Sequence, residues 1–106
     1  MTDRQTLKEI TKCLLEGNQG ELLSTINKVS SLGKNLTQLA KDMVTFVRDI
    51  LVTKSCKDYK NILKLPADQI KDLEELAGLT TNEKLIEILN KLSSLDNEFR
   101  YTNNPR

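Results

Sequence analysis

Apolar residues recur at steps of three and four positions along almost the whole chain, which is the spacing that gathers them on one face of an α-helix. No stretch alternates apolar and polar residues for long enough to predict a β-strand. Glycines and Pro66 interrupt the pattern and divide it into about five segments. At 106 residues the chain is long enough for one domain and too short for two ordinary ones. The sequence therefore predicts an all-α fold, a single domain over residues 1–106 with about five helices in an antiparallel array.

Capping residues and helix breakers give approximate boundaries for these helices. The helices are predicted over residues 3–16, 18–32, 35–54, 66–77 and 80–100. Their expected N-terminal caps include Asn18, Asn35 and Thr80, and their expected ends include Gly17, Gly33 and Gly78. The third helix would be roughly 28 Å long, enough to cross a domain of this size, so it is expected to be the long central helix. Residues 55–65 have weaker periodicity and predict a connection with one helical turn.

The end of the third predicted helix is apolar over more than one face. It carries Phe46, Val47, Ile50, Leu51 and Val52. Two arrangements fit this pattern: the domain surrounds the helix end with its own helices, or another subunit buries part of it. Periodicity alone favours the first. Arg48 lies inside the same stretch and can either reach solvent or pair across an interface, so Phe46, Arg48 and Ile50 are candidate subunit-interface residues.

The residue types needed for catalysis are mostly missing. The chain has no histidine, the most common general base and a leading zinc ligand, and its four glycines form no phosphate-binding loop. Carboxylate pairs such as Asp68 with Asp72 fit a solvated helix face better than a metal site, because Lys71 lies between them. Cys13 and Cys56 lie outside any CxxC pair and are expected to be reduced. The sequence predicts a non-enzymatic protein with no catalytic residue, metal, cofactor or small-molecule substrate.

Charge and hydropathy limit the partners and the location of the protein. The formal net charge of +1 gives no signal toward nucleic acid or an anionic membrane. The longest apolar runs are only a few residues, whereas a membrane span needs roughly twenty. The N-terminal stretch MTDRQTLKEITKCLLEGN is charged and amphipathic and lacks the pattern of a secretory signal. A cytoplasmic protein that uses no membrane is therefore expected.

One stretch supports an alternative function. The sequence IKDLEELAGLTTNEKLIEILNKL predicts two helices joined by a short turn, as in helix-turn-helix DNA-binding modules. That motif has a small residue inside its first helix and a glycine four positions later, whereas Ala77 and Gly78 are adjacent here. The residues expected to be exposed early in the second helix, including Glu83, Lys84 and Glu87, are close to neutral overall. A small DNA-binding module is thus the alternative, and direct nucleic-acid binding is not the expected function.

Short motifs follow one another along the chain in a characteristic order. The first helix ends in LLEGN, the second ends in SLGKN, the third contains FVRDILVTK, and the chain closes with LNKLSSLDNEFRYTNNPR. In this order and spacing the chain resembles the third domain of the gamma and tau subunits of bacterial DNA polymerase III. The Arg-Asp-Leu-Leu stretch of that family is matched by Arg48, Asp49, Ile50 and Leu51. Its closing acid, aromatic and Asn-Pro-Arg are matched by Glu98, Tyr101, Asn104, Pro105 and Arg106.

The resemblance implies a role in the clamp loader for DNA replication. In that family the third domain is a helical collar that performs oligomerisation, and its partners are other clamp-loader subunits, namely gamma or tau copies, delta and delta-prime. ATP and Mg would belong to an upstream ATPase domain. Family members continue after Pro-Arg into another apolar helix, so the chain is expected to be an excised fragment without the upstream ATPase domain and that final helix. Tyr101, Pro105 and Arg106 are therefore further candidate interface residues.

Overall fold

The protein is an all-α array in the computed structural model, which describes the backbone of residues 2–31 and 35–103 and the side chains of that part up to residue 94. Its helices are α1 (Arg4–Glu16), α2 (Gln19–Ser31), α3 (Leu36–Ser55), α4 (Tyr59–Leu63), α5 (Ala67–Ala77) and α6 (Asn82–Asn103). The described residues contain no strand. The predicted fold class is confirmed, and α4 is the single helical turn expected within residues 55–65.

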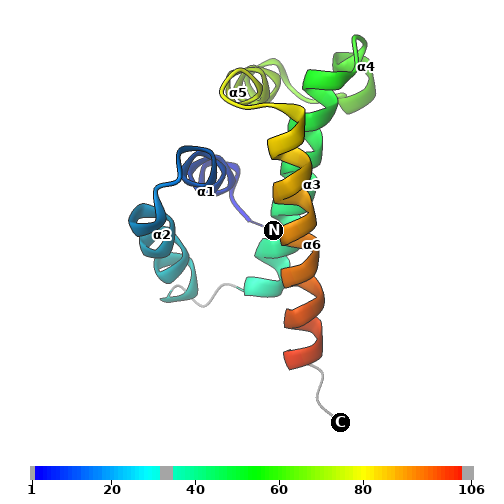
Figure 1. Ribbon diagram of the computed structural model, residues 1–106. Coiled ribbons are helices and arrows are strands. Elements are labelled where there is room, and N and C mark those ends of the chain that lie inside the picture. The colour runs from blue at the N-terminus through cyan, green and yellow to red at the C-terminus, as the bar shows by residue number, and fades with distance from the viewer. Residues whose placement is uncertain (1, 32–34, 104–106) are drawn as a thin grey trace.

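The long helix α3 is the centre of the array, as predicted. It contacts α1, α4, α5 and α6, and its contact with α6 is the most extensive in the chain. In Figure 1, α3 and α6 run side by side in opposite directions, α5 lies where α3 ends and α6 begins, and α1 and α2 lie to one side of α3. Helices α1, α4, α5 and α6 are therefore arranged around α3, whereas α2 packs mainly on α1.

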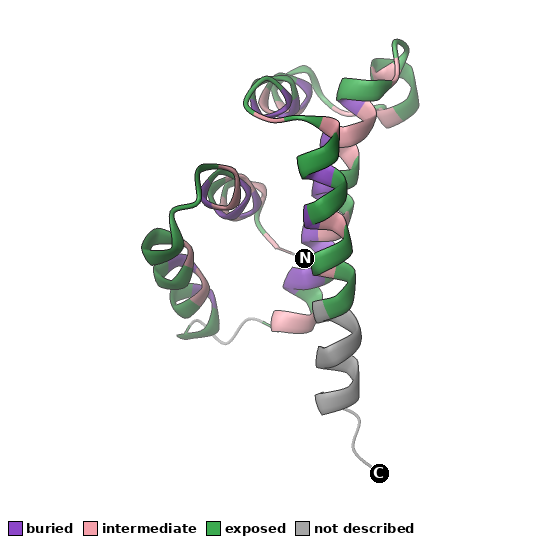
Figure 2. Ribbon diagram, in the orientation of Figure 1, coloured by how far each residue is buried: buried purple, intermediate pink, exposed green. Residues whose placement is uncertain are grey.

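The hydrophobic core lies on the faces of the helices that meet around α3. Figure 2 shows these faces as bands of buried residues, with exposed residues on the outer sides. The core residues that α3 contributes are Leu39, Ala40, Met43, Phe46, Val47 and Ile50. They meet Leu7 and Ile10 of α1 and residues of the later helices that include Leu73, Leu76 and Leu85. Because this spacing is helical in each element, the sequence pattern was sufficient to identify most of the core.

Glycine and asparagine set several helix boundaries. Gly17 ends α1 in the left-handed conformation at φ 71°, which glycine adopts without the steric cost of a Cβ atom. The Asn18 Oδ1 atom accepts from the backbone N–H of Glu21 at 3.2 Å, as the predicted cap requires. The Asn35 Oδ1 atom accepts from the N–H groups of Thr37 and Gln38 at 2.8 and 3.3 Å. The predicted stop at Gly33 lies outside the described residues.

The cap predicted at Thr80 is wrong by one residue. Helix α6 begins at Asn82, and the Thr81 Oγ1 atom accepts from the backbone N–H of Lys84 at 3.2 Å. Thr80 still belongs to the turn that closes α5, because its own N–H donates to the Ala77 carbonyl at 3.5 Å. Because Thr80 and Thr81 are adjacent and can both act as N-terminal caps, the sequence pattern could not distinguish which of them caps α6.

Polar contacts fix α1 against the rest of the domain. The Thr2 backbone N–H donates to Asp42 of α3 at 2.6 Å. The Lys8 ammonium lies 3.0 Å from Asp72 and 3.8 Å from Glu75, both on α5. These contacts hold the start of α1 on α3 and its middle beside α5.

Candidate subunit interface

The predicted interface residues on α3 lie on opposite faces of that helix. Phe46 and Ile50 are 2% and 0% exposed in the domain's own core, whereas Arg48 is exposed. The domain therefore buries Phe46, Val47 and Ile50 with its own helices, as periodicity favoured, while Leu51 and Val52 at the same end of α3 are partly exposed. The structure does not bring Phe46 and Ile50 together with Arg48 on one surface, and a role for these three residues in subunit contact stays a prediction.

The remaining predicted interface residues lie at the end of the chain. Tyr101 belongs to the backbone of α6, which continues to Asn103 and thus extends beyond the predicted end near residue 100. The Tyr101 side chain, Pro105 and Arg106 lie outside the described residues. Their assignment also stays a prediction.

Arg4 forms a contact that the sequence analysis did not identify. Its guanidinium carbon lies 5.3 Å from the centroid of the Phe46 ring, in the range of a cation–π interaction. Its Nε and Nη2 atoms are buried without a hydrogen-bond partner among the described residues. The hollow around it is lined by Arg4, Leu7, Asp42, Thr45, Phe46 and Asp49. No spacing within α1 could have revealed this contact, because it depends on how α1 packs on α3.

The two carboxyl groups in this hollow have opposite pKa shifts. Burial opposes ionisation of Asp42, but hydrogen bonds from the Thr2 N–H and from Gln38 Nε2, the latter at 2.8 Å, outweigh burial and lower its pKa. Burial raises the pKa of Asp49, and the positive charges of Arg4 and Arg48 offset only part of that effect. Asp42 is therefore a hydrogen-bonded structural carboxylate, whereas no hydrogen bond from another described residue stabilises the charge of Asp49.

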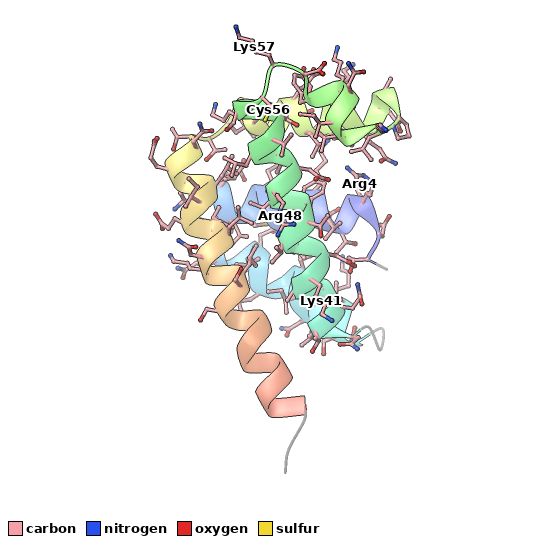
Figure 3. All side chains as sticks on the ribbon, turned by 90° about the vertical axis from the view of Figure 1, so that its right-hand side faces the viewer. Arg4, Lys41, Arg48, Cys56 and Lys57 are labelled. Carbon is pink, nitrogen blue, oxygen red and sulfur yellow. The ribbon has the colours of Figure 1, made fainter. Side chains whose placement is uncertain are left out.

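The outward side of α3 carries exposed positive charge. Lys41 and Arg48 are exposed on this helix, and Lys57 is exposed just beyond its end. Figure 3 looks onto this side and shows the three residues distributed along it, with Arg4 at one edge. None of the three forms an ion pair within 4.0 Å with another described residue. We refer to Lys41, Arg48 and Lys57 as the basic face.

Exposed negative charges lie along α1 and at the start of α2. Cys13 is buried and free, and burial followed by the charges of Glu21, Glu16 and Glu9 raises the pKa of its thiol. All three glutamates are exposed and have no ion pair among the described residues. Cys56 is also free and partly buried, so the two cysteines form no disulfide with each other. We refer to Glu9, Glu16 and Glu21 as the acidic face.

An apolar hollow lies between α1, α2, α3 and α6. It is lined by Ile10, Ile26, Leu36, Leu39, Ala40, Met43 and Leu92. A site for a small molecule normally adds a few placed polar groups that orient the ligand, and this lining has no polar side chain. The hollow can accept apolar side chains but offers no group for chemistry.

The alternative DNA-binding stretch corresponds to α5, residues 78–81 and α6. In α6, Lys84 and Lys91 lie 3.7 and 3.3 Å from Glu87, and Glu83 is also exposed. The two lysines are therefore balanced by two glutamates, and they form no basic stripe of the kind that binds phosphate groups. Helix α6 also packs along α3 through Leu85 and Ile88, which are buried.

The described residues offer neither a cluster of metal ligands nor a membrane-spanning helix. No group of three or more histidine, cysteine, aspartate or glutamate side chains in this part of the chain could hold a metal ion. No described helix is both long enough and apolar enough to span a bilayer.

Comparison with known proteins gives the family of the chain. Residues 1–106 match the family described as DNA polymerase III subunits gamma and tau domain III. Over 100 residues the chain is 30% identical to the DNA polymerase III subunit tau of Bacillus subtilis (strain 168), covering 92% of this chain and 17% of that protein. The chain thus spans about a sixth of the length of this relative, and no solved structure gives a significant match. Together with the all-α array around α3, these findings show that the chain belongs to the family of domain III of the DNA polymerase III gamma and tau subunits, a non-catalytic segment of those proteins.

Proposed function

We propose that this domain is the oligomerisation, or collar, domain of a clamp-loader subunit of the gamma and tau type in bacterial DNA replication. The observation that carries the proposal is the match to domain III over the whole length of the chain. The structure supports it because the basic face and the acidic face carry exposed charges that form no ion pair with other described residues. Such surfaces fit a domain that binds other proteins.

The proposal also names the partners of this domain and assigns nucleotide binding to another domain. The partners would be other clamp-loader subunits, namely gamma or tau copies, delta and delta-prime, in the cytoplasm. ATP and Mg would be bound by a separate upstream domain, and this segment would bind no cofactor. A downstream helix would complete the domain. Tyr101, Pro105 and Arg106 would lie next to that helix and could then take part in subunit contact.

Size measurement of the assembled loader tests the proposal. A full-length subunit that contains this segment is mixed with the other loader subunits, and the mass of the complex is measured by size-exclusion chromatography with light scattering. The same subunit without the segment is measured in parallel, and nucleotide binding by its upstream domain serves as the control for folding. We expect the complex to form only with the segment present. Assembly of a complex of unchanged mass without it would refute the collar role.

A further inference from the structure

We propose that α2 is a lid over the apolar hollow between α1, α2, α3 and α6, and that it detaches and recloses while the other helices stay folded. The open form would uncover the apolar side chains that α1 and α3 contribute to the hollow. This inference does not depend on the proposed function, because it follows from how α2 is held in the domain.

Helix α2 packs mainly on one neighbour. Its extensive contact is with α1, whereas α1, α5 and α6 each pack on α3. Of its 13 residues only Thr25 and Val29 are buried, and Leu23 is 61% exposed. Figure 1 shows α2 at the outer edge of the array, and Figure 2 shows that most of its surface is exposed. An element that buries so few residues opens at a lower free energy than the whole domain needs to unfold.

The polar contacts of α2 with other described residues are all local. They lie within residues 17–31, and the Thr25 Oγ1 atom, for example, donates to the Glu21 carbonyl one turn earlier at 3.0 Å. No ion pair joins α2 to another described helix. Helix α1 differs, because Thr2 at its start bonds to α3 and Lys8 pairs with α5. Polar contacts therefore fix α1 in place, whereas α2 is held by apolar contact.

The space between α2 and the later helices is not filled. The hollow has a volume of about 110 Å³, and Ile26 of α2 lines it together with residues of α3 that include Leu39 and Met43. Packed interiors leave few voids larger than a water molecule, so a hollow of this size removes dispersion contacts that would otherwise hold α2 against α3. The contact of α2 with α3 is therefore weaker than the packing in the rest of the core.

The joint between α1 and α2 is short and contains Gly17. This residue has φ 71°, and no atom lies within 4 Å of the position that a Cβ atom would take there. Glycine also reaches more backbone conformations than other residues. The joint can therefore change its angle at Gly17 without displacing a neighbouring side chain.

Cys13 of α1 provides a reporter of the closed lid. Its side chain is 6% exposed. Burial raises the pKa of its thiol most, and among the charges Glu21 of α2 has a larger effect than Glu16 or Glu9 of its own helix. Cys13 therefore lies next to the start of α2, so opening of α2 would expose its thiol.

Hydrogen exchange of backbone amides under native conditions tests the inference in the 106-residue chain. A detached helix of 13 residues is marginal in water, so the α2 amides exchange in the open form. Amides of residues 23–31 should be at least about tenfold less protected than the buried amides of α3, and low urea should hardly change their exchange. The α3 amides should exchange through unfolding of the whole domain, with a steep dependence on urea.

Two alanine substitutions in α2 separate the lid contact from general effects on this helix. Ile26→Ala removes a side chain that lines the hollow and should speed exchange of the α2 amides about fivefold or more. Leu23→Ala is the matched control, because Leu23 is exposed, and should leave the rate unchanged. Labelling of Cys13 by iodoacetamide, measured in a Cys56→Ser background, should change by the same factors, because both measurements report the same opening.

Ile70→Val tests whether α2 opens separately. Ile70 is buried in α5 and does not line the hollow. Loss of its methyl group should weaken the whole domain and speed exchange of the α3 amides about threefold or more. It should leave the α2 amides and Cys13 labelling unchanged, since α5 stays packed in the open form.

The inference is wrong if the α2 amides are as protected and as dependent on urea as those of α3. It is also wrong if Leu23→Ala acts as strongly as Ile26→Ala, or if Ile70→Val changes α2 and α3 equally. None of these results affects the deletion experiment on the whole loader, which tests the collar role by itself.

Discussion

Phe46 and Arg48 show how two residues close in sequence come to have different roles. The helix turns by about 200° between them, so one points into the core while the other points into solvent. The sequence predicted a helix here and identified both as interface candidates. It could not decide which of them a partner could reach, because the answer depends on where α1 packs. The position of Arg4 over the Phe46 ring, 5.3 Å from its centroid, depends on the same packing.

Phe46→Ala should lower the free energy of unfolding by about 3 to 5 kcal/mol, because the ring is 2% exposed and its loss leaves a cavity under Arg4. Urea denaturation measures the change. Arg48→Ala on the same helix is the matched control and should stay within about 0.5 kcal/mol of the unchanged chain, since Arg48 is exposed. Equal effects of the two substitutions would contradict the assignment of faces on α3.

Asp42 and Asp49 should give opposite pH dependence. The pKa of Asp42 is lowered in the folded state, although burial opposes this, because of its hydrogen bonds from Thr2 and Gln38. Its contribution to stability is therefore present above the ordinary pKa of 3.8 and is lost as the pH falls below that value. Burial raises the pKa of Asp49, so the effect of this group is the opposite. The stability of the domain falls as the pH rises from the ordinary pKa of Asp49 through its folded-state pKa.

Denaturation midpoints between about pH 3 and pH 7 check this. Relative to the unchanged chain, Asp42→Asn should be less stable near neutral pH, and the difference should shrink in acid. Asp49→Asn should lose the decline in stability with rising pH. Parallel pH curves for the unchanged chain and both variants would contradict the pKa directions.

At the scale of helices, capping and periodicity predicted the order and bounds of the array closely. The start of α3 was correct because Asn35 is both a good cap in sequence and the acceptor for two backbone N–H groups in the structure. The start of α6 was one residue off because Thr80 and Thr81 are equivalent in sequence. The structure distinguishes them, because the Thr81 Oγ1 atom accepts from Lys84 of α6 whereas the Thr80 N–H donates back to Ala77 of α5.

Gly17→Ala should destabilise the domain by about 1 to 2 kcal/mol, because the residue has φ 71° and a Cβ atom is strained in that conformation. No atom lies within 4 Å of the added Cβ, so the effect would come from the backbone alone. Gly20→Ala is the control: it lies in α2, where an added Cβ meets only the Asn18 Oδ1 atom at an ordinary contact distance of 4.0 Å, and it should stabilise by about 0.5 to 1 kcal/mol. Thermal or urea unfolding should show the two shifts with opposite signs.

Asn35→Ala should cost about 0.5 to 2 kcal/mol, since it removes the acceptor for the N–H groups of Thr37 and Gln38 at the start of α3. Asn27→Ala, exposed inside α2, provides the comparison and should be neutral or slightly stabilising. A loss of stability at Asn27 as large as that at Asn35 would mean that the cap has no special role.

At the scale of the whole molecule, the sequence predicted a helical domain arranged around α3, and the motif order indicated its family. It did not predict the opposed basic and acidic faces. Lys41 and Arg48 carry a spacing of seven residues, as do Glu9 and Glu16, but this pattern is common on exposed helices. It becomes informative only when the packing of α1 on α3 turns the two faces in opposite directions. The opposite directions of the two faces are therefore a property of the assembled fold.

We propose that this domain holds clamp-loader subunits together. Native mass spectrometry can test this on the loader reconstituted from full-length subunits with or without this segment. We predict a complex containing the full set of subunits when the segment is present, and separate subunits when it is removed while nucleotide binding upstream is retained. A complex with the same subunit composition in both samples would contradict the claim.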